Sequence, residues 1–133
     1  MEAMMSDDLT DIWHGRFSFP RLYEPVSFTA RLEQSGDNLA GTIGELAPRG
    51  AAAGLVLTST ISGTVKGGAV TFLKTYDALV EGYDSVHYAG AVFDGGLEIN
   101  GDWTIRNDWA GAFLMIRSRG LYQGILRREA ERV

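Results

Sequence analysis

The sequence predicts an all-β fold, a single eight-stranded antiparallel up-and-down β-barrel that takes up residues 1–133 as one domain. Eight runs of residues alternate between apolar and polar side chains, which is the period of a half-buried strand. Clusters of glycine and aspartate separate these runs, and no internal repeat or linker divides the chain. Because 45% of the 133 residues are apolar, the chain can bury one continuous core.

The elements follow in order from an N-terminal segment, residues 1–10. We expect a short helical turn at residues 6–11, because Ser6 is a suitable N-cap and the aspartates after it favour the positive end of a helix. The expected strands are residues 13–19, 25–33, 38–45, 55–65, 69–76, 85–92, 97–105 and 111–117. In the tail at residues 120–133, helical spacing predicts a C-terminal helix that carries Leu121, Tyr122, Ile125 and Leu126.

The connections between the strands alternate in length. Tight hairpins are expected at residues 35–37, 66–68 and 94–96, where glycine and aspartate supply the positive φ angles of short turns. Longer loops are expected at residues 20–24, 46–54 and 77–84, with a shorter link at residues 106–110. In an antiparallel barrel the tight hairpins therefore gather at one end, here called the floor, and the longer loops at the other, the mouth.

Side chains alternate across a strand, so the position in each run assigns the face. The expected inward face is apolar and consists of Trp13, Phe17, Phe28, Ala30, Leu32, Leu39, Ile43, Leu57, Ile61, Val70, Phe72, Val86, Tyr88, Ile99, Trp103, Phe113 and Met115. The opposite face is mostly polar and includes both histidines, His14 and His87. A sheet with one apolar face must close on it, and a barrel of eight strands encloses a packed interior or one small ligand.

The first and last strands carry a family resemblance. Trp13 follows the turn at residues 6–11, and Arg117 ends the eighth strand on the same face at the floor. This arrangement resembles the calycins, the superfamily of lipocalin, fatty-acid-binding and avidin-like barrels, in which an arginine covers a tryptophan of the first strand. The resemblance implies a structural role for both residues, since a guanidinium stacked on an indole gains about 0.5–2 kcal/mol.

Within that superfamily the nearest likeness is to the avidins. It rests on Leu39-Ala40-Gly41-Thr42, on Leu57-Thr58, and on Gly95-Gly96 leading to Trp103. Of the biotin contacts of that family only Trp103 matches a ligand-stacking position. Ile43 and Glu45 stand in place of a tyrosine and a serine, and Gly15 in place of an asparagine. The resemblance therefore implies the fold and argues against biotin.

A few polar side chains are expected on the inward face: Glu45, Ser59, Lys74, Tyr76, Tyr88 and Arg117. From these and one tryptophan we expect a ligand site of Glu45, Lys74, Tyr76, Tyr88 and Trp103. Lys74 would hold an acidic head group while the aromatic residues stack or donate hydrogen bonds. In the plainer interpretation Glu45 and Lys74 reach solvent at strand ends as a weak ion pair, and Tyr88 and Trp103 are core residues.

Composition narrows the function classes. The chain has no cysteine, which excludes disulfides and thiolate chemistry and favours a cytoplasmic protein. With a net charge of −5 and scattered basic residues, nucleic acid is not an expected partner, and no apolar run predicts membrane insertion. We expect no catalytic residue, metal ligand or cofactor, because both histidines face outward and no nucleophile motif is present.

Three hypotheses remain. The first is non-catalytic binding of a small, largely hydrophobic ligand in the barrel lumen. The second is a barrel-type cyclase or isomerase in which Glu45 or Lys74 moves a proton, a reading that lacks a convincing buried acid–base pair in the sequence. The third is a structural module with a filled lumen that forms homo-oligomers through an outer apolar patch of Leu73, Ala112, Leu114 and Ile116.

Overall fold

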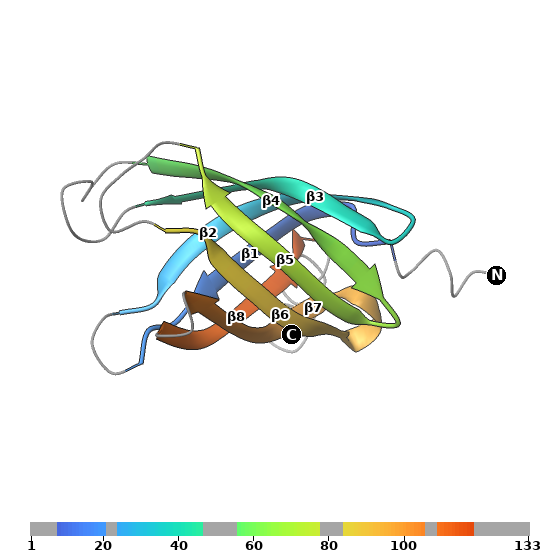
Figure 1. Ribbon diagram of the computed structural model, residues 1–133. Helices are drawn as coiled ribbons and strands as arrows, with labels where there is room; N and C mark the ends of the chain where they lie inside the picture. Colours follow the sequence, from blue (N-terminus) through green and yellow to red (C-terminus); the bar gives the residue numbers. More distant parts are fainter. Residues whose placement is uncertain (1–7, 21–23, 47–55, 78–83, 106–108, 119–133) are drawn as a thin grey trace, which may run out of the picture.

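The computed structural model describes residues 8–20, 24–46, 56–77, 84–105 and 109–118, and within them the chain forms a closed antiparallel barrel (Figure 1). Each strand pairs with its neighbours in sequence, and β8 closes the barrel on β1. The elements are β1 (Asp11–Phe17), β2 (Val26–Ser35), β3 (Asn38–Leu46), β4 (Val56–Lys66), β5 (Ala69–Tyr76), β6 (Val86–Phe93), the 3₁₀ turn η1 (Asp94–Gly96), β7 (Glu98–Ile105) and β8 (Trp109–Arg117). The predicted fold class and strand order are confirmed.

The short connections lie together at the floor, on the right in Figure 1. Gly36 and Gly67 have φ angles of 61° and 56°, as the hairpins β2–β3 and β4–β5 require. The connection between β6 and β7 is longer than the predicted hairpin, because η1 and Leu97 lie between the two strands. Asp94 adopts a positive φ of 58° there, ahead of two glycines that do the same.

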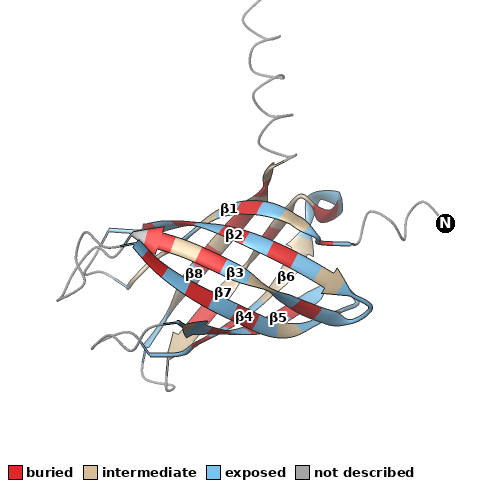
Figure 2. Cartoon of the chain, turned by 90° about the horizontal axis from the view of Figure 1, so that it is seen from above, coloured by how far each residue is buried: buried red, intermediate tan, exposed pale blue. Residues whose placement is uncertain are grey.

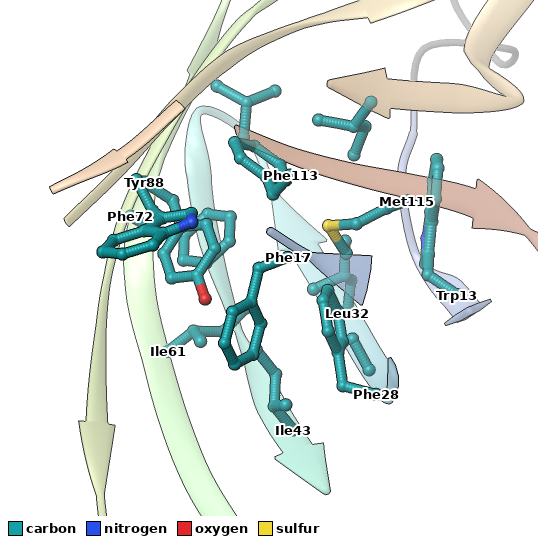
Figure 3. Packing of buried hydrophobic residues seen from close by; sticks show 14 of the residues in the cluster. Trp13, Phe17, Phe28, Leu32, Ile43, Ile61, Phe72, Tyr88, Phe113 and Met115 are labelled. Carbon is teal, nitrogen blue, oxygen red and sulfur yellow. The ribbon is translucent and has the colours of Figure 1, made fainter. Parts of the chain in front are cut away.

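The interior contains the residues that strand parity predicts. All seventeen expected inward side chains are at most 7% exposed, and buried and exposed residues alternate along the strands (Figure 2). Aromatic rings of nearby strands pack together in the lumen: Phe72 of β5 stacks on Tyr88 of β6 with ring centroids 4.7 Å apart, and Phe113 of β8 meets Tyr88 edge-on at 5.0 Å (Figure 3). The three rings belong to the buried apolar cluster inside the barrel.

Glycines on the inward side of the strands let the small barrel close. A Cβ atom at Gly41 would lie 2.1 Å from the carbonyl oxygen of Arg31, and one at Gly63 would lie 1.9 Å from that of Thr71. Both are shorter than any real contact, so neighbouring strands approach one another at these points only because no side chain intervenes.

The segment before β1 is not the helical turn that the sequence predicts. Asp8, Leu9 and Thr10 are not helical, and Asp11 already belongs to β1, where it pairs with Leu32. The Asp8 carboxylate accepts a hydrogen bond from the Thr10 amide at 2.9 Å and so supports a local turn in place of a helix. Ser6 lies outside the described residues, as does the expected C-terminal helix at residues 120–133.

Trp13 and Arg117 lie side by side at the floor, where they are cross-strand partners. The Arg117 guanidinium is 5.5 Å from the Trp13 ring, and it donates hydrogen bonds to the Asp11 carboxylate at 2.8 Å and to the backbone oxygens of Asp8, Thr10 and Gly96. The Trp13 indole donates to the Leu9 carbonyl at 2.9 Å, which holds the fully buried Leu9 side chain over the floor. Hydrogen bonds from Trp13 on β1 and from Arg117 on β8 therefore hold the segment before β1 at the floor.

Candidate functional site

Three of the five expected site residues meet inside the barrel. Lys74 Nζ donates to Glu45 Oε1 at 2.5 Å, and the Tyr76 hydroxyl donates to Glu45 Oε2 at 3.1 Å and to Oε1 at 3.3 Å. Glu45 comes from β3 and the other two from β5, so the contact crosses over the intervening β4. The structure therefore brings together Glu45, Lys74 and Tyr76 of the expected ligand site.

The burial of Glu45 and Lys74 overturns the plainer interpretation. Glu45 is 3% exposed and Lys74 is 0% exposed, so they are not a solvated pair at strand ends. Lys74 pairs with Ile61 on one side and Val86 on the other, and this register places its side chain within the lumen. Glu45 and Lys74 form a buried ion pair. Its net contribution to folding stability depends on how completely hydrogen bonds replace those that the two groups made with water.

Aromatic rings surround the lysine. Lys74 Nζ lies 4.7 Å from the ring centroid of Phe17, 4.6 Å from that of Tyr76 and 5.9 Å from that of Tyr88. We call these three rings the aromatic cage. Because the faces of aromatic rings attract cations, the cage partly replaces the hydration that the ammonium loses on burial.

The environment shifts two proton equilibria. Burial lowers the pKa of the Lys74 ammonium, and the Glu45 carboxylate opposes this without cancelling it. Burial raises the pKa of the Tyr88 phenol, and the negative charge of Glu45 raises it further. Tyr88 is therefore a neutral hydroxyl throughout the physiological range.

Ser59 lies in the middle of this group. On β4 it pairs with Ile43 on one side and with Tyr76 on the other, and in the register it is diagonal to both Glu45 and Lys74. Its side chain is fully buried, yet its hydroxyl has no hydrogen-bond partner within the described part of the chain. We call Glu45, Ser59, Lys74 and Tyr76 the polar cluster.

Sequence reasoning placed Ser59 on the inward face but left it out of the site. The signal was present, since a serine at an inward position among Leu57 and Ile61 must find a partner or remain unsatisfied. Phe17 was likewise assigned to the core alone, although its ring faces the lysine. No spacing rule in the sequence relates a β1 aromatic residue to a β5 lysine.

Tyr88 and Trp103 differ in their relation to the cluster. Tyr88 is part of the cage, and among the described residues its hydroxyl forms no hydrogen bond. The Trp103 indole donates to the Ser18 carbonyl at 2.9 Å, and its ring meets Phe19 edge-on at 5.5 Å. Trp103 therefore joins the mouth-side end of β1 to β7, and no described hydrogen bond links it to the polar cluster.

Exposure inside the barrel differs between the two ends. Trp13, Ala30 and Leu32, near the floor, are 0% exposed, whereas Phe17 and Leu57, nearer the mouth, each retain 7%. At the floor, Val65 beside the β4–β5 hairpin is 8% exposed, which is similar to Phe17 and Leu57. Within the polar cluster, Ser59 and Lys74 are 0% exposed and Glu45 is 3% exposed, while Tyr76 at the mouth end of β5 is partly exposed.

The outer surface has fewer features of a binding site than the lumen. A shallow hollow of about 230 Å³ on β1, β2 and β8 is lined by His14, Gly15, Arg16, Ser27, Leu114 and Ile116. His14 and His87 are exposed on the outer face, and no three histidine, aspartate or glutamate residues among those described gather as metal ligands would.

The outer apolar patch expected from the sequence does not form one surface. Leu73 lies on β5, and the register passes from it through His87 and Thr104 to Ala110, so β6 and β7 separate it from the β8 residues. Leu114 and Ile116 remain neighbours on β8, but both are half-buried. The patch is therefore smaller than the oligomerisation hypothesis assumes.

None of the described segments forms a helix with the length and apolar character that crossing a bilayer requires. No protein-family model, no curated protein and no solved structure matches the chain.

Proposed function

We propose that this protein is a non-catalytic binding module that holds a small, largely apolar ligand in the mouth half of its barrel. The observation that carries the proposal is the polar cluster, because it is buried in an otherwise apolar lumen. Ligand pockets have this composition: they are mostly apolar, with a few polar groups that fix the ligand's orientation. A packed core gains little from an ion pair, since apolar residues of similar volume are often at least as stabilising.

The resemblance to the calycins supports the same proposal. Trp13 and Arg117 make the floor contact that the superfamily would place there, and the connections at that end are short. A ligand would enter from the mouth, pass Phe17 and Leu57, and meet the polar cluster with its head group.

The test is native mass spectrometry of the purified protein, compared with its denatured mass. We expect a small molecule that is retained in the native state and lost on denaturation. Leu57→Trp, which points into the mouth, should abolish retention, whereas Thr58→Trp, its outward-facing neighbour on β4, should not. The native mass also gives the subunit count.

A clean native mass needs a second measurement. Calorimetric titration with ethylbenzene, acetophenone, 1-phenylethanol and benzoate covers apolar, carbonyl, hydroxyl and acidic head groups on one ring. If none of these binds and no molecule is retained, the binding function is wrong and the filled-lumen reading stands in its place.

A barrel-type cyclase or isomerase is the second candidate, and one observation favours it. The buried acid–base pair that the sequence left in doubt is present, with Glu45 and Lys74 in direct contact. If Glu45 acts as a base, the protein should speed exchange of the acetophenone methyl protons in D₂O, and Glu45→Gln should abolish this. Binding without protein-dependent exchange would favour the binding module.

A further inference from the structure

We propose that the lumen site selects an uncharged head group that accepts a hydrogen bond, such as the carbonyl of a ketone, ester or amide, and that the Ser59 hydroxyl donates to it. This inference rests on the proposed binding function and names the ligand class. Of the acidic or polar head group that the sequence allows, it selects the polar, uncharged one.

The charges of the polar cluster argue against an acidic ligand. Lys74 is the one cation in the cluster, and the Glu45 carboxylate already neutralises it at 2.5 Å. Both groups are almost fully buried, so a ligand carboxylate would bring a second negative charge next to Glu45 where little water screens it. The site therefore favours a neutral ligand.

The hydrogen-bonding groups argue for an acceptor. Both Glu45 oxygens already accept bonds, one from Lys74 and both from Tyr76. The Ser59 hydroxyl, by contrast, is buried and has a proton but no partner among the described residues. Tyr88 adds a second hydroxyl without a described partner, and Lys74 has only one carboxylate oxygen for its three protons. What the cluster lacks is an acceptor, which a ligand carbonyl supplies.

The position of Ser59 identifies it as the donor. It is flanked by Ile43 and Tyr76 in the register, so its hydroxyl faces the lumen between the apolar wall and the cluster. The Phe17 and Tyr88 rings lie 4.7 Å and 5.9 Å from the Lys74 ammonium, which is diagonal to Ser59 in the register.

The experiment measures Kd by calorimetry for three matched probes: acetophenone, ethylbenzene and benzoate. The wild-type protein should bind acetophenone about tenfold more tightly than ethylbenzene, as one hydrogen bond would give, and more tightly than benzoate. Ser59→Ala should remove most of the preference for the ketone. Ser62→Ala, an exposed serine on the same strand, should leave it unchanged.

Thermal unfolding of the same variants separates a ligand contact from a structural one. Without ligand, Ser59→Ala should raise Tm, because it removes a buried hydroxyl that has no partner. A variant that is more stable yet binds the ketone less tightly is the signature of a group kept for the ligand.

Each other outcome overturns the proposal in a recognisable way. Equal binding of acetophenone and ethylbenzene, or tightest binding of benzoate, would show the head-group assignment to be wrong while the binding function stands. An unchanged preference and a lower Tm in Ser59→Ala would show that the hydroxyl has a structural partner instead. Failure of all three probes, with no retained molecule, would remove the binding function as well.

Discussion

At the level of single residues, the main feature is that the Glu45–Lys74 ion pair is buried. Removing one partner leaves the other charge buried without compensation, which typically costs about 3–5 kcal/mol, whereas replacing both partners with neutral side chains is often close to neutral. We therefore predict that Lys74→Met lowers the free energy of unfolding by about 3–5 kcal/mol, and that Glu45→Gln in the same chain restores most of the loss. Urea unfolding of the two single variants and the double variant measures the coupling.

The chain supplies a matched control for this cycle. It has only two lysines, and the second, Lys66, is exposed at the β4–β5 hairpin. Lys66→Met should change stability by less than about 0.5 kcal/mol. If Lys74→Met were equally mild, the pair would have to be solvated, and the buried polar cluster would not exist in solution.

The sequence predicted which residues meet at this site but not their depth. Strand parity and position near the mouth placed Glu45, Lys74 and Tyr76 at one rim, and the structure has them in contact. Parity assigns a face and carries no information about how far a long side chain extends along the lumen, so it left open whether the pair reaches solvent. Whether the Ser59 hydroxyl finds a hydrogen-bond partner depends on side chains from β3, β4 and β5 together, and no local sequence pattern encodes that arrangement.

Two glycines of β3, one facing inward and one facing outward, show how glycine acts at the scale of strands. Gly41 and Gly44 lie on β3, three residues apart, and they differ in what a side chain would meet. At Gly41 a Cβ would press against the backbone of Arg31 on β2, whereas at Gly44 nothing lies within 4 Å. Substitution at Gly41 therefore tests the close approach of β2 and β3, and substitution at Gly44 tests the general effect of removing a glycine from a strand.

We predict opposite effects of alanine at these two glycines. Gly41→Ala should destabilise the protein by about 1–3 kcal/mol or more, because β2 and β3 must move apart. Gly44→Ala should stabilise it by up to about 1 kcal/mol, since alanine loses less conformational entropy than glycine on folding. Thermal unfolding decides this, and a neutral Gly41→Ala would mean that the β2–β3 contact is looser than the structure shows.

Strand prediction succeeded where the alternating pattern was strong and failed at its edges. The predicted and observed ends of β3, β4 and β5 agree within one residue. The turn expected at residues 6–11 failed because Asp11 finds a cross-strand partner in Leu32, and ladder pairing outweighs the local capping preference. The 3₁₀ turn at Asp94 was read as a tight hairpin because both use the same glycine-rich sequence.

At the scale of the whole barrel, hydrogen bonds hold the floor end together. At the floor Arg117 of β8 donates hydrogen bonds to Asp8 and Thr10 before β1, to Asp11 on β1 and to Gly96 in η1, and the Leu9 side chain is fully buried. No comparable set of hydrogen bonds crosses the mouth among the described residues. Adaptation to a ligand is therefore expected at the mouth, while the floor holds the register of the closed sheet.

The stability of the molecule should respond to alkaline pH through two buried groups. The folded-state pKa of Lys74 is lowered, so between that pKa and its ordinary value of about 10.4 the unfolded chain binds more protons and stability rises with pH. The folded-state pKa of Tyr88 is raised, so above its ordinary value of about 10 the unfolded chain loses a proton that the folded chain keeps. Stability then falls as pH increases.

Tyr88→Phe isolates the second effect. The Tyr88 hydroxyl has no described hydrogen-bond partner, so the variant should be nearly as stable as the wild type at pH 8. Above pH of about 10 the wild type should lose stability relative to the variant, by up to about 1.4 kcal/mol for each pH unit, because only the wild-type unfolded chain can ionise at this position. Urea unfolding at intervals from about pH 8 to pH 11.5 measures the difference. Parallel curves would mean that the Tyr88 phenol ionises in the folded protein as it does in water, and the lumen around Lys74 would then have to be hydrated rather than closed by the aromatic cage.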